Sequence, residues 1–181
     1  MLILDVRADG SPLGEELRHI WPSYVAYAIS FFTIGIIWVN HHVVMDQLGR
    51  VDRTFLFMNV LFLMVVAFIP FPTGLVAHYI RDGGDDARDA VLAYGFTFTL
   101  MAIGYGILWW YAAGGKRLLK EDADPRTVAG ITRSFRPGSI VYLGATLLAL
   151  ASPVASLCVF AALALAYVLE SGIFVRGEHR E

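Results

Sequence analysis

Five side chains that can exchange protons, bind a metal ion or form hydrogen bonds lie within one short stretch of the chain. They are Trp38, Asn40, His41, His42 and Asp46. On a helix, His42 and Asp46 are about one turn apart and face the same way. His41 and His42 are adjacent, so their side chains diverge by roughly 100° and cannot readily share one metal ion. We expect no metal site here, and a structural polar network instead, because polar groups at membrane depth are costly to leave unpaired.

The composition of the chain indicates an all-α, polytopic membrane protein. Of 181 residues, 57% are hydrophobic and 17% are charged, and the mean hydropathy is +0.60. These values are too apolar for a soluble domain of this size, and the apolar residues come in long blocks. The single cysteine, Cys158, excludes a disulfide framework and a cysteine-based metal site. We expect no cofactor, no nucleic-acid partner and no enzymatic activity.

The apolar blocks predict five complete transmembrane helices in a single domain that covers residues 1–181. The expected spans are 21–45, 54–77, 90–113, 137–151 and 154–175. A hydrocarbon core of roughly 30 Å needs a helix of about 20 residues, so the fourth block is a marginal span.

Two features inside these spans predict how the helices are shaped and packed. Pro70 and Pro72 predict a kink near the end of the second span, since each proline removes a backbone donor. Small residues recur at helical spacing in the third span, which would let a neighbouring helix approach closely. This stripe consists of Gly95, Thr99, Ala102 and Gly106.

The distribution of basic residues predicts the orientation in the membrane. With five spans, the 45–53 turn, the 114–136 loop and the C-terminus share one side and hold ten of the fourteen Lys and Arg residues. Basic loops favour the cytoplasmic side of a cell membrane, so we expect a multi-pass protein of the inner membrane with a cytoplasmic C-terminus. That places residues 1–20 outside. Residues 1–6 are interpreted as the tail of a first helix whose beginning is missing.

Several motifs together resemble the prokaryotic relatives of transmembrane protein 175, a lysosomal potassium channel. These are a Trp-Pro-Ser-Tyr entry at Trp21, a Ser-Phe-x-x-Ile-Gly-x-x-Trp-x-Asn-His-His run from Ser30, a Leu-x-x-x-Asp turn ending at Asp52, and a Phe-x-Pro-Phe-Pro-Thr exit from Phe68. The resemblance covers roughly residues 1–115, and its specific part lies between residues 20 and 75. The family's Arg and Phe-Ser-Asp signature, in the first half of the first helix, is absent from this sequence.

This resemblance implies a potassium-permeable channel subunit that assembles as a homotetramer in the lipid bilayer. The first helix of each subunit would line the pore, and apolar side chains would form its constriction. Met1 and Leu4 would be the pore-lining remnant of that helix. The polar network around His41 would brace the pore helix. Potassium is the implied ion, with protons as an open alternative.

Other interpretations of the polar residues remain open. Either His41 or His42 could sense protons, because the unperturbed pKa of histidine lies near 6.5. The alternative is a non-conducting membrane protein or a redox protein that binds haem or quinone. Axial haem ligands are histidines at matching depth on facing helices, whereas His41 and His42 both lie at one end of the same span. An intramembrane hydrolase would need a nucleophile beside a base, and no such pair appears.

Overall fold

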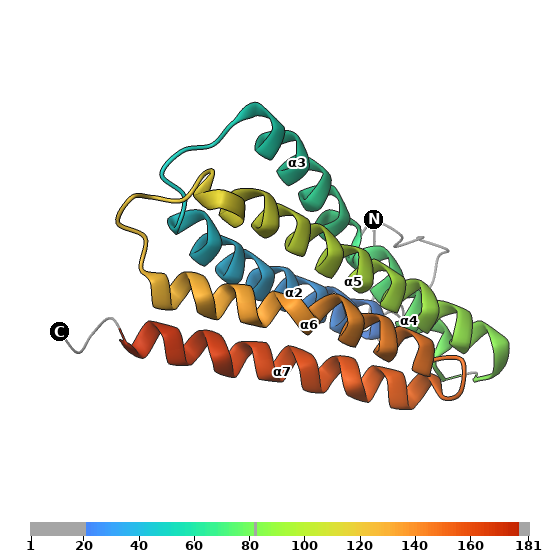
Figure 1. Cartoon of the computed structure of the whole chain (residues 1–181). Helices are drawn as coiled ribbons and strands as arrows, with labels where there is room; N and C mark the ends of the chain where they lie inside the picture. The colour runs from blue at the N-terminus through green and yellow to red at the C-terminus, as the bar shows by residue number, and fades with distance from the viewer. Residues whose placement is uncertain (1–20, 82, 178–181) are drawn as a thin grey trace.

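The chain folds into a bundle of α-helices, and the computed structural model describes residues 21–81 and 83–177 (Figure 1). Over these residues the expected all-α fold is confirmed. The expected remnant at residues 1–6, with Met1 and Leu4, lies outside the described part. The elements are α2 (Trp21–Asp46), α3 (Arg53–Phe68), α4 (Pro70–Tyr79), α5 (Gly84–Ala113), the 3-10 turn η1 (Gly114–Lys116), α6 (Pro125–Leu148) and α7 (Pro153–Gly177).

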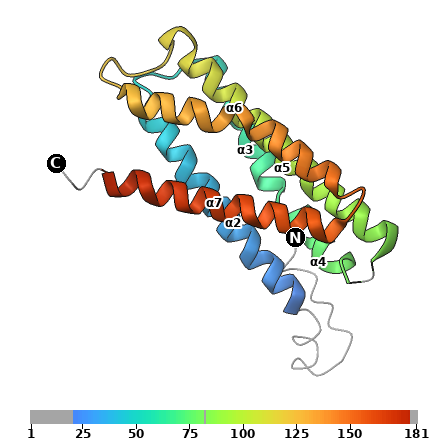
Figure 2. The same cartoon turned by 60° about the horizontal axis from the view of Figure 1, so that its bottom comes forward.

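Helix α5 occupies the centre of the bundle and contacts α3, α4, α6 and α7 (Figure 1). Its 30 residues extend about 45 Å at helical rise. Among the described residues, three helical stretches are long and apolar enough to cross a membrane: Tyr27–Asp46, Arg53–Tyr79 and Gly84–Lys116. Helix α7 packs on α6 and crosses α2 (Figure 2). The membrane limits of all five expected spans stay predictions.

The second expected span consists of two helices that meet at Ile69. Pro70 has no N–H to donate, so the helix breaks directly before it, and the Ile69 carbonyl accepts hydrogen bonds from Thr73 N at 3.2 Å and Thr73 Oγ1 at 2.9 Å. Beyond the break, α4 packs against both α2 and α5, whereas α3 packs chiefly against α5. Beyond the proline pair, the chain therefore packs against α2 as well as against α5.

Two helices begin earlier than the apolar blocks predict. Helix α6 begins at Pro125, where the sequence predicts a polar connector up to residue 136. Asp124 caps this start by accepting from Arg126 N at 3.1 Å and Thr127 N at 2.9 Å. Helix α5 begins at Gly84, whereas the expected span begins at residue 90. Hydropathy does not detect either start, because the first turns of both helices are polar.

A close contact joins α5 to α6. Thr99 Oγ1 lies 3.0 Å from Thr146 Oγ1, and Thr146 Oγ1 also donates to the carbonyl of Tyr142 at 2.8 Å. Gly95 lies against the same threonine, so closely that a Cβ at this position would be 2.6 Å from Thr146 Oγ1. Of the expected small-residue stripe, Gly95 and Thr99 thus make the helix contact, while Gly106 has open space beside it.

Candidate functional site

His41 is the polar residue of the expected network that points into the bundle. Its Nε2 lies 2.7 Å from Oδ1 of Asn59 on α3, which is a hydrogen bond between neighbouring helices. The imidazole lies flat on Phe62, with ring centroids 5.7 Å apart, and edge-on to Tyr105 of α5 at 6.3 Å. His41 therefore joins α2 to both α3 and α5.

Aromatic side chains extend this contact across the bundle to α6. Tyr105 packs on Phe62 at 5.0 Å and on Phe135 at 4.7 Å, and Phe135 packs on Trp109. Trp109 Nε1 donates to Thr132 Oγ1 at 2.9 Å. The Tyr105 hydroxyl is buried and has no hydrogen-bond partner among the described residues. These rings fix the relative positions of α3, α5 and α6 around His41.

Trp38, His42 and Asp46 lie on another, exposed side of α2. The rings of Trp38 and His42 are stacked with centroids 5.6 Å apart, and His42 Nε2 lies 3.6 Å from Asp46 Oδ2. All three side chains are exposed. Asn40 is half-buried, and its amide makes no hydrogen bond within the described part of the chain. Of the five candidate residues, Trp38, His42 and Asp46 thus form one group, and His41 makes separate contacts inside the bundle, because adjacent residues on a helix diverge.

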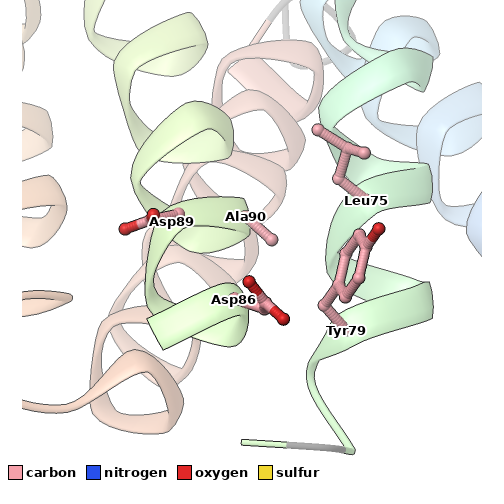
Figure 3. A pocket seen from close by; sticks show the side chains of 5 residues that line it. All are labelled: Leu75, Tyr79, Asp86, Asp89 and Ala90. Carbon is pink, nitrogen blue, oxygen red and sulfur yellow. The ribbon is translucent and has the colours of Figure 1, made fainter. Parts of the chain in front are cut away.

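Metal chemistry has no support among the described residues, where no three His, Cys, Asp or Glu side chains cluster to hold an ion. The acidic first turns of α5 lie beside a shallow hollow of about 260 Å³ lined by Leu75, Tyr79, Asp86, Asp89 and Ala90 (Figure 3). Arg88 offsets part of the negative charge of this region, because it pairs with Asp85 at 2.9 Å and with Asp89 at 3.2 Å. The hollow is a surface feature between α4 and α5.

Two loops are fastened together at the end of the bundle where α2 and α5 finish. We call this contact the loop clasp, which consists of residues 47–52 and 117–120. Gly49 N donates to the Leu118 carbonyl at 3.0 Å, and Lys120 N donates to the Gln47 carbonyl at 2.9 Å. A Cβ on Gly49 would lie 3.1 Å from the Lys120 Cα, so glycine permits this close approach.

Asp52 ties the loop clasp to α3 and α5. Its Oδ1 accepts from Phe55 N at 2.8 Å and caps α3, while Oδ2 accepts from the Tyr111 hydroxyl at 2.8 Å. The Phe55 hydrogen bond, with help from Tyr111 and the nearby charge of Arg117, holds the pKa of Asp52 below its ordinary value despite the opposing effect of desolvation. Asp52 therefore stays ionised and fixes where α3 starts.

We expect Asp52→Asn to remove an acid-sensitive part of the protein's stability. A carboxylate with a lowered pKa stabilises the folded state above its ordinary pKa of about 3.9, and this contribution is lost as the pH falls through the lowered value. The wild-type melting temperature, measured in detergent from pH 7 to pH 3, should fall more steeply than that of the variant. Asp122→Asn, at an exposed position, is the control and should follow the wild-type curve.

The chain is similar to known proteins of one family. A family model described as "Endosomal/lysosomal potassium channel TMEM175" matches residues 1–70. The chain is 40% identical over 172 residues to a potassium channel of Streptomyces collinus, covering 92% of this chain and 82% of that protein. The chain belongs to the TMEM175 family. This is a family of ion channels, which are not enzymes, and membership decides against the hydrolase and redox interpretations.

Further TMEM175 relatives cover most of the same chain. A potassium channel of Chamaesiphon minutus is 37% identical over 177 residues, which cover 94% of this chain and 86% of that protein. The crystal structure of a lysosomal potassium-selective channel TMEM175 homolog from the same organism matches with a TM-score of 0.75 and 34% identity, over 94% of this chain and 88% of that one. A chicken relative named an endosomal/lysosomal proton channel is 26% identical over 110 residues, 54% of this chain and 22% of that protein.

Sequence reasoning missed three residues of the site. Asn59 lies in an otherwise apolar stretch, where a lone amide needs a partner, and this signal could have paired it with His41. Asp52 directly precedes an apolar run, which is the position of a helix N-cap. Tyr111 gave no signal, because its partner Asp52 is distant in sequence and only the fold brings them together.

Proposed function

We propose that this TMEM175 family member is one subunit of a potassium-permeable channel in a cell membrane. The observation that carries this proposal is the likeness, over 94% of the chain, to a solved potassium-selective channel homologue. We further propose that four identical subunits surround the pore and that the first helix lines it, with Met1 and Leu4 on its pore face. Partly dehydrated cations would pass a constriction of apolar side chains, which opens by widening and wetting.

The uncovered faces of α2 and α3 support assembly into an oligomer. Both helices carry large apolar side chains that are more than half exposed within the described part of the chain. They are Phe31 and Phe32 of α2 and Phe57, Val60, Leu61 and Met64 of α3. A membrane protein can cover such faces with lipid or with another subunit, and the proposed tetramer would cover part of them.

The polar residues near the end of α2 take a supporting role in this proposal. His41 links α2 to α3 and α5 through Asn59, Phe62 and Tyr105, and this linkage would hold the wall against which the pore helix packs. Trp38, His42 and Asp46, on the exposed side of α2, and Asn40, on a different side of the same helix, would also brace the pore helix. None of them needs to contact the permeating ion.

Ion flux into liposomes tests the channel proposal directly. The natural protein, as its own cells produce it, is purified and reconstituted, and flux is followed with potassium, sodium or a large organic cation as the only permeant candidate. We expect potassium flux, and none of the organic cation. A separate arm with a pH gradient and no potassium tests protons as the permeant ion. Flux of protons without potassium would contradict the proposal.

We also propose that the acidic turn before α5 and the basic loop after it lie on opposite sides of the membrane, with the basic loop and the C-terminus cytoplasmic. Single cysteines at Asp85 and at Glu121, in a chain whose exposed Cys158 is replaced by serine, should react with an impermeant label from the outside and from the cytoplasm respectively. Labelling of both positions from one side would overturn this topology.

A further inference from the structure

Exposed basic side chains gather at the end of the bundle that holds the loop clasp. They are Arg50, Arg53, Lys116, Arg117, Lys120 and Arg126. The ion pairs within the described part of the chain involve none of them, since those pairs join His42 to Asp46 and Arg88 to Asp85 and Asp89. At the opposite end of α5, by contrast, Arg88 contacts two carboxylates. The clasp end therefore carries positive charge that no carboxylate neutralises by direct contact.

Three of these arginines are held in place by uncharged partners. Arg50 donates from Nε at 3.1 Å and from Nη2 at 2.9 Å to the carbonyl of Arg117. The Arg117 guanidinium lies 4.6 Å from the centroid of the Tyr111 ring, and that of Arg53 lies 5.8 Å from the centroid of Phe57. Carbonyls and ring faces orient a guanidinium without cancelling its charge, and its edge keeps N–H donors for an oxyanion.

Asp52 lies close to this group, and its two carboxylate oxygens are already engaged. Oδ1 accepts from Phe55 N and Oδ2 from the Tyr111 hydroxyl, and although the charge of Arg117 acts on this carboxylate, Asp52 forms none of the ion pairs of the described residues. Large aromatic side chains are exposed near this end of the bundle: Phe57, which contacts Arg53, is 62% exposed, and Trp110, near the end of α5, is 76% exposed. Exposed aromatic rings beside basic side chains are typical of the boundary between hydrocarbon and headgroups.

We propose that Arg50, Arg53 and Arg117 form a binding site for the phosphate headgroup of an anionic phospholipid. The arginines are oriented before the lipid arrives, which lowers the entropic cost of binding. Their planar N–H donors suit a phosphate oxyanion. The exposed rings of Phe57 and Trp110 would lie against the first part of the acyl chains. Bound lipid would fasten the loop clasp from outside, because Arg50 and Arg117 belong to its two loops.

Thermal melting of the full chain in a neutral detergent tests this site, with phosphatidylglycerol, phosphatidylcholine or inorganic phosphate added at matched phosphate concentration. We expect phosphatidylglycerol alone to raise the melting temperature. In Arg53→Gln/Arg117→Gln the half-saturating lipid concentration should rise about 25-fold, since each basic residue near an anionic headgroup contributes about fivefold. Arg126→Gln makes the same type of charge change at this end and should alter it less than about twofold in 0.15 M salt.

Each remaining outcome contradicts the proposal. An equal loss in Arg126→Gln would show diffuse attraction to the basic end instead of a site. An equal effect of inorganic phosphate would show a site for free anions. Unchanged lipid dependence in the double variant would show that these arginines do not bind the headgroup. If the double variant melts much lower without lipid, Arg53→Gln alone carries the test with an expected fivefold change, because its guanidinium rests on the exposed Phe57 ring.

Discussion

Gly95→Ala is expected to destabilise the protein by about 1 to 3 kcal/mol, the usual cost of forcing extra volume into a packed contact. The new Cβ would lie 2.6 Å from Oγ1, 2.9 Å from Cγ2 and 3.0 Å from Cβ of Thr146. Thr146 cannot turn aside without cost, because its hydroxyl contacts Thr99 and donates to the Tyr142 carbonyl. Helices α5 and α6 would have to separate, which the melting temperature in detergent would report.

Gly106→Ala is the matched control for this prediction. Gly106 lies in the same helix, and a Cβ there would meet nothing within 4 Å. Alanine favours helix over glycine by up to about 1 kcal/mol, so this variant should be neutral or slightly stabilised. Equal destabilisation by both substitutions would show that backbone effects, and not the contact with Thr146, decide the outcome.

Asn59→Leu and His41→Ala are each expected to lower stability by about 1 kcal/mol or more, because each leaves a part-buried polar partner without its hydrogen bond. His41→Ala also removes the ring that packs on Phe62 and Tyr105. Val60→Leu, at an exposed position on the same helix as Asn59, is the control and should change stability by less than about 0.5 kcal/mol.

A double-mutant cycle separates the hydrogen bond from the other effects of these two changes. The double variant should be more stable than the sum of the single losses predicts, with a coupling energy of about 0.6 to 1.7 kcal/mol, the range found for side-chain hydrogen bonds in membrane proteins. Strictly additive losses would show that His41 and Asn59 do not interact. Unchanged stability with altered ion selectivity would contradict a supporting role for His41 altogether.

The fold class, the family and the helix break at Ile69 could be predicted from the sequence. The predictions of the fold class and of the helix break rest on local features of the sequence. Long apolar blocks predict helices that can span a membrane, and the proline pair predicts a break in the helix because proline has no N–H to donate. The start of α6 at Pro125 was not predicted, because the first turns of this helix are polar. Asp124 and Pro125 nevertheless form a recognisable helix start. The apolar blocks show where a helix can cross a membrane and not where the helix begins.

The pairing of side chains across helices was harder to predict. The spacing of His42 and Asp46 predicts that they share one side of a helix, and their side chains lie 3.6 Å apart in the structure. The partners of His41 come from α3 and α5, and a single sequence does not give the rotation of one helix against another. The same reason hides the contact of Tyr111 with Asp52 and that of Gly95 with Thr146. For Asn59 and Gly95, the signal in the sequence was a polar or small residue within an apolar block.

Electrical recording across a planar bilayer that holds the purified natural protein is the most direct test of whether this protein conducts potassium. With a tenfold potassium chloride gradient across the bilayer, we expect currents that reverse near the potassium equilibrium potential and persist when chloride is replaced by a large anion. A reversal potential near that of chloride, or the absence of current from protein shown to be inserted, would contradict a potassium-permeable channel.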